Sequence, residues 1–173
     1  MLRPDYFARR VSAVSVDELA EKGVRGIILD LDDTLVGYGH DSPAEEEVAW
    51  LAQVRERGLR AAIVSNGRAD RTQAIARQTG LACVARAGKP SPGGLRRALA
   101  LLGTTPLETV VIGDQLFTDV LGARLLGLRC IMTSPITSRT ETWVRIMRFI
   151  ERLALRNAPE QSTELSRRAA QQR

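Results

Sequence analysis

Short apolar runs alternate with helical patterns along most of this chain. The sequence predicts five buried strands, at 24–29, 59–64, 81–85, 109–112 and 128–132. It predicts four helices between them, at 43–57, 70–78, 92–102 and 118–126. This alternation indicates an α/β fold: a Rossmann-like, doubly wound, mostly parallel five-stranded sheet with right-handed crossovers.

Size and composition narrow the class of protein. The chain has 173 residues, 44% hydrophobic and 26% charged, which fits one globular domain. Aromatic residues make up only 4%, too few for the stacking surfaces of single-stranded nucleic-acid binders, so we expect no nucleic-acid partner. Cys83 and Cys130 lie in apolar runs and are expected to be two buried thiols. With no secretory signal pattern and no run of about 18 apolar residues, a cytoplasmic location is expected.

The net charge of +5 is concentrated at the C-terminal end. Residues 139–173 hold 8 basic and 4 acidic side chains, which accounts for +4 of the total. Over 141–157 the arginines fall on one helical face and apolar residues on another. Such a helix either lies on an anionic membrane surface or packs its apolar face on the domain. We therefore expect a globular domain over 1–138 with a short N-terminal extension, a basic amphipathic helix over 139–157, and a disordered tail over 158–173.

Polar side chains gather where the predicted strands end. The carboxyl ends of parallel strands meet at one edge, where such sheets bind ligands. That edge is expected to hold Asp30, Asp32, Thr34, Ser65, Asn66, Lys89, Asp114 and Asp119. Each residue alone could serve only a turn or a helix end. Together, carboxylates within a few ångströms repel by about 1 to 4 kcal/mol per pair unless a cation neutralises them.

The donor types indicate which cation and which ligand suit this edge. Oxygen ligands without histidine or cysteine favour Mg²⁺. A lysine and a serine beside that ion supply the positive charge and the donor that a phosphoryl group needs. The sequence therefore predicts a site for Mg²⁺ and a phosphorylated substrate.

These residues stand in four motifs that resemble those of the haloacid dehalogenase superfamily of phosphotransferases. The motifs are DLDDTL at 30–35, Ser65, Lys89, and GDQLFTD at 113–119. Within the superfamily the chain is most similar to the small YqeG-type phosphatases of subclass IIIA. That similarity rests on LRPDYF at 2–7, GIILDLDDTL at 26–35, IVSNG at 63–67, VIGDQLFTDVLGA at 111–123 and TSPI at 133–136. The YqeG group is in turn similar to phosphatases of phosphatidylglycerophosphate, an anionic lipid intermediate.

The resemblance implies a role for each matched carboxylate. Asp30 would be the nucleophile that forms an aspartyl-phosphate, and Asp32 would be the general acid and then the base that activates water. Mg²⁺ would be held by Asp30, Asp114 and the backbone carbonyl of Asp32. Residues two apart point the same way from a strand end, which suits the pairing of Asp30 with Asp32.

The resemblance also implies the phosphate-binding side of the site. Ser65, the backbone amide of Asn66 and Lys89 would bind the phosphoryl oxygens, and Lys89 would take part in catalysis. Asp119 would steady Lys89 or a water on the metal, and Thr34 would support the first motif.

The intervals between the motifs leave no room for a cap domain, because Asp30 to Ser65 spans 35 residues and Ser65 to Lys89 spans 24. An uncapped site is open to bulky or surface-bound substrates. We expect a Mg²⁺-dependent phosphomonoester hydrolase that acts on an anionic lipid headgroup, phosphatidylglycerophosphate, at the inner face of the membrane, with contact through 141–157.

Two alternatives stay open: a phosphatase of soluble phosphomonoesters, and a non-catalytic binding or assembly protein with the same fold. A phosphorylation-receiver domain is disfavoured. In such a domain the lysine comes last, whereas Lys89 precedes Asp114 and Asp119.

Overall fold

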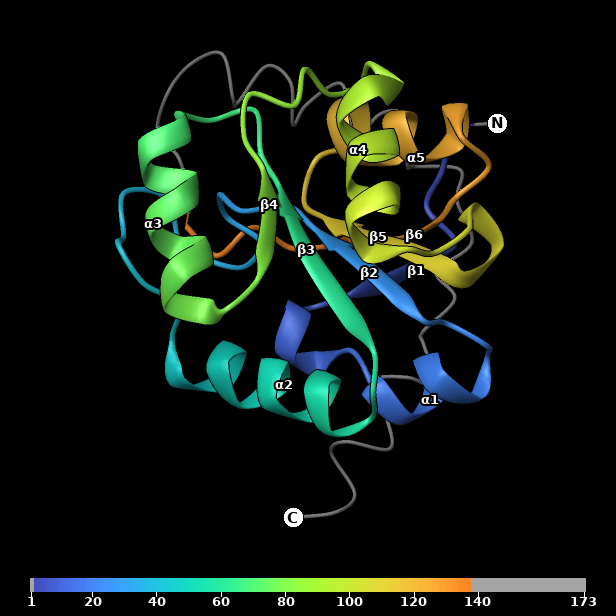
Figure 1. The fold of residues 1–173 in the computed structure, drawn as a ribbon, viewed down its shortest axis with the longest axis horizontal. Coiled ribbons are helices and arrows are strands. Elements are labelled where there is room, and N and C mark those ends of the chain that lie inside the picture. The colour runs from blue at the N-terminus through green and yellow to red at the C-terminus, as the bar shows by residue number, and fades with distance from the viewer. Residues whose placement is uncertain (1, 138–173) are drawn as a thin grey trace.

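A computed structural model describes residues 2–137 (Figure 1). These residues form a six-stranded sheet in the order β1-β6-β5-β2-β3-β4, and every pairing is parallel. The strands are β1 (Tyr6–Ala8), β2 (Gly26–Leu29), β3 (Arg60–Val64), β4 (Ala82–Val84), β5 (Thr109–Gly113) and β6 (Arg129–Thr133). The α-helices are α1 (Val16–Glu21), α2 (Glu45–Glu56), α3 (Ala69–Thr79), α4 (Pro92–Leu102) and α5 (Leu121–Leu125). The predicted helix over 139–157 and the predicted tail over 158–173 lie outside the described residues.

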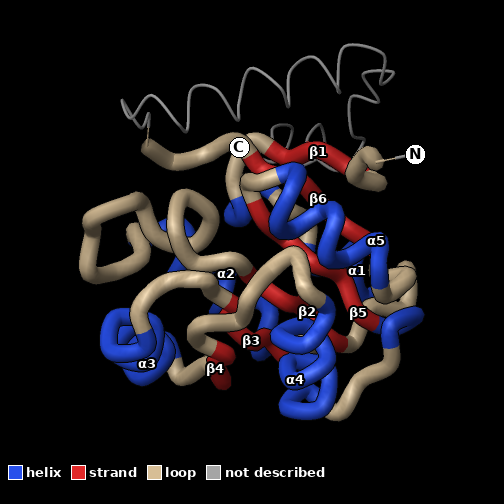
Figure 2. Tube along the Cα trace, turned by 90° about the horizontal axis from the view of Figure 1, so that it is seen from above, coloured by secondary structure: helices blue, strands red, loops and turns tan. Residues whose placement is uncertain are grey.

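The predicted α/β class is confirmed, but the sheet has six strands rather than five. The additional strand, β1, belongs to the segment expected to be an N-terminal extension, and it pairs with β6 at the edge of the sheet (Figure 2). Its three residues are too few to show an apolar run. The aspartate before it helps to fix the pairing, because the Cys130 amide donates to Asp5 Oδ2 at 2.8 Å. Helix α1 was not predicted either; its Ser15 Oγ accepts from the Glu18 amide at 3.2 Å and so caps a six-residue helix.

Two apolar layers cover the sheet. Alternate residues of β2 point to opposite faces, so Ile27 and Leu29 pack with α1, α2 and α3, while Ile28 packs with α4 and α5. Both faces are therefore buried, which explains the continuous apolar runs of the central strands. Between β2 and β3 the only α-helix among the described residues is α2, and between β3 and β4 it is α3, so no inserted cap domain lies within 2–137.

The helix predicted over 118–126 differs from the structure. A π-helix over Leu116–Val120 comes first and α5 follows it. Single-turn π-helices are rare and occur often at functional sites, and this one carries Asp119. The two cysteines are free, as predicted, but only Cys130 is fully buried and Cys83 is partly exposed. Within residues 2–137 no helix is long and apolar enough to cross a membrane.

Candidate active site

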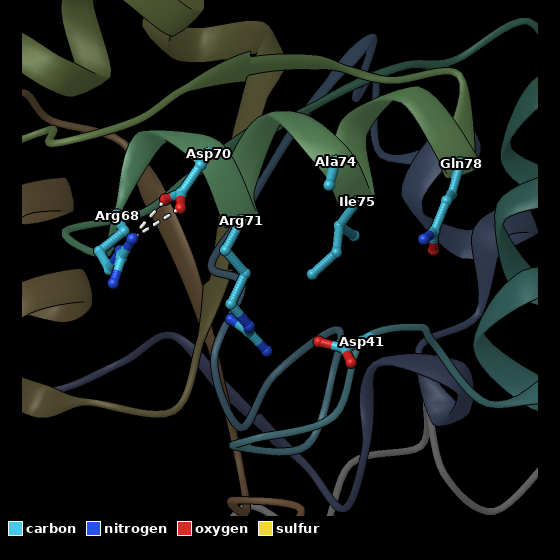
Figure 3. Close-up of a pocket in the computed structure, with 7 residues that line it drawn as sticks. All are labelled: Asp41, Arg68, Asp70, Arg71, Ala74, Ile75 and Gln78. Carbon is cyan, nitrogen blue, oxygen red and sulfur yellow. Dashed lines mark hydrogen bonds and ion pairs between the residues drawn. The ribbon is translucent and has the colours of Figure 1, made fainter.

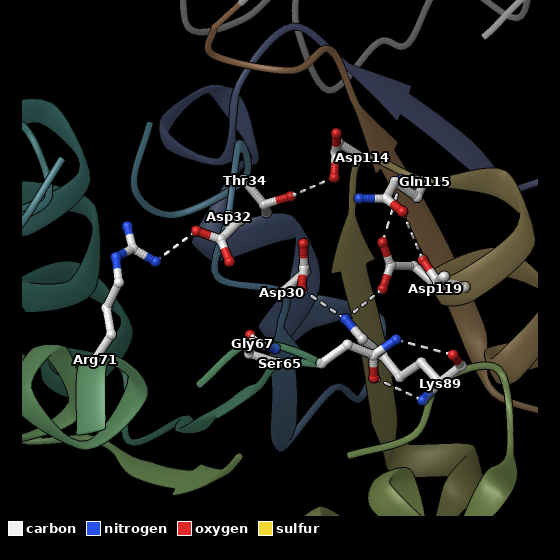
Figure 4. Close-up of polar contacts among 12 residues, drawn as sticks. Asp30, Asp32, Thr34, Ser65, Gly67, Arg71, Lys89, Asp114, Gln115 and Asp119 are labelled. Carbon is white, nitrogen blue, oxygen red and sulfur yellow. Dashed lines mark hydrogen bonds and ion pairs between the residues drawn. The ribbon is translucent and has the colours of Figure 1, made fainter. Parts of the chain in front are cut away.

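The sheet order brings the predicted site residues to one edge (Figure 4). Strand β2 lies between β5 and β3, so the segments that follow these three strands are neighbours. Asp30 and Asp32 follow β2, Ser65 follows β3 and Asp114 follows β5. Lys89 reaches the same edge from the loop between β4 and α4.

A buried ammonium group joins two of the carboxylates. Lys89 Nζ lies 2.6 Å from Asp30 Oδ1 and 2.7 Å from Asp119 Oδ1. The three side chains are only 3%, 8% and 1% exposed, respectively. Burial alone lowers the pKa of Lys89, but the charges of Asp119 and Asp30 outweigh it and raise that pKa above its usual value. Lys89 therefore stays protonated at neutral pH.

The pKa of the Asp30 carboxyl lies well above its usual value. Burial raises its pKa from 3.8 to about 7, and the nearby charge of Asp119 raises it as well, although Lys89 opposes the shift. In Figure 4 one carboxylate oxygen of Asp30 faces Lys89 and the other points away from it. Asp30 therefore offers one oxygen that is fixed by the lysine and a second that is turned toward the rest of the site.

Asp119 depends on a glycine for its position. Its Oδ2 accepts from the backbone amide of Gln115 at 3.1 Å, at the start of the π-helix. A Cβ added at Gly113 would lie 2.4 Å from both Cγ and Oδ2 of Asp119. Only glycine at the end of β5 lets this carboxylate lie against the strand and still reach Lys89. Gly113 opens the fourth motif, directly before Asp114, but it was not predicted as a site residue.

Three buried carboxylates could hold a cation. Asp30, Asp114 and Asp119 each offer an oxygen within 4.8 Å of the other two. Thr34 Oγ1 donates to Asp114 Oδ1 at 3.5 Å, which links the first motif to the fourth. Of these three acids, Asp30 and Asp119 share one ammonium group, that of Lys89. The cluster therefore has more acids than cations, and its all-oxygen donor set fits a hard divalent ion. The predicted metal ligands were Asp30, Asp114 and the backbone carbonyl of Asp32. The cluster of side chains contains Asp30 and Asp114 together with Asp119, and the Asp32 carbonyl stays a predicted ligand.

Asp32 has a different partner. Its Oδ1 accepts from Arg71 Nη1 at 2.5 Å, and Arg71 Nη2 donates to the carbonyl oxygen of His40 at 2.7 Å. Arg71 stands in the first turn of α3 and was not among the predicted site residues. Its place near the site could have been predicted, because α3 begins just after Ser65, at the same edge of the sheet. The two carboxylates of the first motif are thus paired with different cations, a buried lysine and a partly exposed arginine.

Hydrogen bonds to the side chain of Asp33 stabilise the turn that carries Asp32. This residue adopts a left-handed conformation with φ 65°, which aspartate tolerates better than most residues. Its Oδ1 accepts from the amides of Tyr38 at 3.2 Å and Thr137 at 3.0 Å and from the Thr137 hydroxyl. These bonds fix the turn between Asp32 and Thr34.

Ser65 and Asn66 shape the other wall. Ser65 Oγ accepts from the Gly67 amide at 2.9 Å. A Cβ added at Gly67 would lie 3.0 Å from Ser65 Oγ and 3.4 Å from Asp32 Oδ2. This glycine, the last residue of the IVSNG segment, was not predicted as a site residue, and it keeps the loop close to both side chains. The side chain of Asn66 forms hydrogen bonds with the backbone carbonyl and amide of Lys89. The backbone amide of Asn66 stays a predicted phosphate ligand.

Known proteins similar to this chain indicate its family. The family model described as haloacid dehalogenase-like hydrolase matches residues 8–127. The chain is 33% identical over 152 residues to the "Probable phosphatase YqeG" of Bacillus subtilis (strain 168), covering 88% of each chain. It is 36% identical over 95 residues to a phosphoserine phosphatase of Thermus thermophilus, covering 50% of this chain and 38% of that one.

Solved structures share the fold. The cobalt-bound deoxy-D-mannose-octulosonate 8-phosphate phosphatase of Haemophilus influenzae superposes with a TM-score of 0.55 at 12% identity, over 78% of this chain and 89% of that chain. A Had-superfamily hydrolase from Ehrlichia chaffeensis gives 0.54 at 16% identity, over 77% and 98%.

Proposed function

This chain belongs to the haloacid dehalogenase-like hydrolases and is a phosphatase of the YqeG type, and we propose that it hydrolyses phosphomonoesters through an aspartyl-phosphate formed on Asp30. The observation that carries this proposal is the pairing of Lys89 with Asp30 and Asp119 at 2.6 and 2.7 Å, while Asp32, two residues along, is held separately by Arg71. These different partners support the two separate roles that we propose, Asp30 as the nucleophile and Asp32 as the acid and base.

In the first step an oxygen of Asp30 attacks phosphorus. The bond between phosphorus and the alcohol oxygen breaks, and protonated Asp32 gives its proton to that oxygen. Lys89 and the Ser65 hydroxyl stabilise the charge on the non-bridging phosphoryl oxygens. The products are the free alcohol and phosphorylated Asp30.

In the second step water attacks the same phosphorus from the side that the alcohol has left. Asp32, now a carboxylate, takes the proton of that water. The bond from phosphorus to Asp30 breaks, which releases inorganic phosphate and restores the Asp30 carboxylate. Using one residue as acid and then as base requires that Asp32 keep a fixed orientation, which its contact with Arg71 provides.

Asp30, Asp114 and Asp119 are the side chains that would hold a divalent ion, which we propose to be Mg²⁺. Bound there, such an ion would offset the repulsion between Asp30 and the anionic phosphate. The raised pKa of Asp30 in the metal-free site fits this role, because a cation that binds there favours the ionised carboxylate.

For the substrate we propose a lipid phosphomonoester, phosphatidylglycerophosphate. Support comes from the resemblance of the YqeG-type motifs to those of phosphatidylglycerophosphate phosphatases and from the lack of an inserted cap among residues 2–137, which leaves the edge of the sheet open to a large substrate. We also propose that the basic segment 141–157 holds the enzyme to the inner face of the membrane. The support for that contact is the arrangement of Arg145, Arg148, Arg152 and Arg156 in the sequence.

The test is phosphate release from phosphatidylglycerophosphate in mixed vesicles, compared with soluble phosphomonoesters, in Mg²⁺ and in EDTA. We expect Mg²⁺-dependent release with a clear preference for the lipid. A preference for soluble esters by orders of magnitude would refute the lipid substrate and leave the phosphatase. Loss of vesicle binding when the four arginines become glutamine would support the membrane contact, and unchanged binding would refute it.

A further inference from the structure

The segment that follows β6 leads from the end of that strand to the turn that carries Asp32. Its residues are 134–137, and they include most of the TSPI sequence at 133–136, which has no part in the proposed mechanism. The segment begins beside β1, where the Ser134 amide donates to the Ala8 carbonyl at 3.3 Å. Because β5 lies between β6 and β2 in the sheet, the segment passes the end of β5 on its way to the turn after β2.

Asp33 binds the far end of the 134–137 segment. Its backbone carbonyl accepts from the Ile136 amide at 3.0 Å. Its Oδ1 accepts from the Thr137 amide at 3.0 Å and from the Thr137 hydroxyl. Asp33 is only 1% exposed, so these bonds lie away from water, where a carboxylate needs donors from the protein. The backbone and the side chain of one residue thus both bind the segment.

Close packing against Gly37 accompanies these bonds. A Cβ added at Gly37 would lie 3.2 Å from Thr137 Cγ2 and 3.3 Å from Ile136 Cγ2. Ordinary contacts between carbon atoms are about 3.5 to 4.0 Å, so a side chain at this position would push the segment away. Because Gly37 has no Cβ, both residues of the segment can lie against the backbone that follows the first motif.

The bonds to Asp33 bear on Asp32 because the two residues share one tight turn. The Asp33 amide donates to the Val36 carbonyl at 2.8 Å, and Asp32 pairs with Val36 in an isolated β-bridge. Asp33 has a left-handed φ of 65°, and its bonds to the 134–137 segment help to maintain it. A displacement of Asp33 would therefore displace Asp32. Arg71, which lines a pocket against α3 (Figure 3), restrains the side chain of Asp32, while the segment restrains its backbone.

We infer that the 134–137 segment positions the general acid, and that Thr137 is a positioning residue for protonation of the leaving group. The inference rests on the proposed function, since it needs Asp32 to be that acid. Without the Thr137 hydroxyl, the Asp33 carboxylate would have one donor fewer and the turn could shift. A small shift of Asp32 weakens proton transfer, because transfer requires hydrogen-bond distance between the acid and the leaving oxygen.

Thr137→Val tests this role, because valine keeps the methyl group that faces Gly37 and replaces only the hydroxyl. Two esters are compared with the full-length protein in Mg²⁺. Propyl phosphate has a leaving alcohol that needs a proton, whereas the leaving group of p-nitrophenyl phosphate is a weak base. We expect kcat/KM to fall roughly tenfold for the propyl ester and less than about twofold for the nitrophenyl ester. Thr137→Ser keeps a hydroxyl and should restore most of the propyl-to-nitrophenyl ratio.

Asp33→Gly is the second variant. Glycine adopts a positive φ readily, so the turn can keep its backbone conformation while the bonds to the carboxylate are lost. It should lower the propyl-to-nitrophenyl ratio of kcat/KM at least as much as Thr137→Val. The matched control is Thr105→Val, which removes a hydroxyl that donates to Glu108 before the start of β5, at the opposite edge of the sheet. This control should leave the ratio unchanged.

A ratio that neither Thr137→Val nor Asp33→Gly changes would overturn the inference while the phosphatase stands. Equal losses for the two esters would also overturn it, because the segment would then support folding or substrate binding rather than proton transfer. No hydrolysis of any phosphomonoester by the wild type would overturn the proposed function and this inference with it.

Discussion

Asn66 and Lys89 hold each other through two hydrogen bonds. Asn66 Nδ2 donates to the Lys89 carbonyl at 2.9 Å, and the Lys89 amide donates to Asn66 Oδ1 at 2.7 Å. The side chain of one residue thus binds both backbone groups of the other. This arrangement fixes the start of the Lys89 side chain, while Asp30 and Asp119 fix its end.

Asn66→Ala should therefore weaken catalysis by displacing Lys89. Both hydrogen bonds are lost, and we expect kcat to fall by about 10- to 100-fold, with a loss of about 1 to 3 kcal/mol in unfolding free energy. Steady-state kinetics and chemical denaturation measure the two effects. Wild-type kcat in Asn66→Ala would show that these two bonds do not position Lys89 for catalysis.

Asp30→Asn should abolish turnover and change how stability depends on pH. Loss of a nucleophile should lower kcat by about 10³-fold or more. In the metal-free wild type, the folded state holds the Asp30 proton up to about pH 7, whereas the unfolded chain releases it near 3.8. Since the folded state binds more protons between these values, this group's contribution to stability falls as pH rises from about 4 to 7. The variant lacks that contribution.

The stability test for Asp30 is the difference in unfolding free energy, wild type minus Asp30→Asn, measured in EDTA across that range. We expect this difference to decrease as the pH rises, because the wild type loses unfolding free energy over this range and the variant does not. A flat difference would mean that the pKa of Asp30 is close to its usual value in the folded protein.

Mg²⁺ binding should release a proton from Asp30. A carboxyl with a pKa of about 7 must ionise before it can hold the cation. Apparent Mg²⁺ affinity is therefore expected to be about tenfold higher at pH 8 than at pH 6. Calorimetry in two buffers of different ionisation enthalpy measures both the affinity and the proton release. Asp114→Asn should weaken binding at both pH values, because Asp114 belongs to the same carboxylate cluster.

Arg71→Ala should affect substrates according to their leaving group. Arg71 holds Asp32, so its loss should impair protonation of the departing oxygen. An alkyl phosphate needs that proton, and p-nitrophenyl phosphate, whose leaving group is a weak base, needs it far less. We expect kcat to fall at least roughly tenfold more for the alkyl ester. Equal losses for both esters would argue that Arg71 acts only on substrate binding or folding.

Gly113→Ala should break the ion pair between Lys89 and Asp119. The new Cβ would lie 2.4 Å from the Asp119 carboxylate, which then has to move away from Lys89. We expect a loss of about 1 to 3 kcal/mol in stability together with most of the activity. Gly93→Ala in α4 is the matched control, because nothing lies within 4 Å of its added Cβ, and alanine favours a helix. Equal stability of the two variants would refute this role for Gly113.

The motif residues could be predicted from the sequence because a parallel sheet restricts where they lie. Once 24–29, 59–64 and 109–112 are recognised as parallel strands, the polar residues after them must share an edge. The helix at Pro92–Leu102 was predicted with its bounds, since proline and glycine mark both ends. Strand β1 was missed because its stability comes from pairing with β6, 125 residues away in the chain, rather than from its own three residues.

The sequence by itself determined the fold class, the family and the group of acids, lysine and serine at one edge of the sheet, because periodicity and motif order are local properties. Only the tertiary structure decided which side chains pair. In it, Lys89 lies between Asp30 and Asp119. Asp32 pairs with Arg71, and the side chain of Asn66 bonds to the backbone of Lys89. These contacts depend on distances of 2.5 to 2.9 Å between segments far apart in the chain, and such distances follow from packing rather than from residue type.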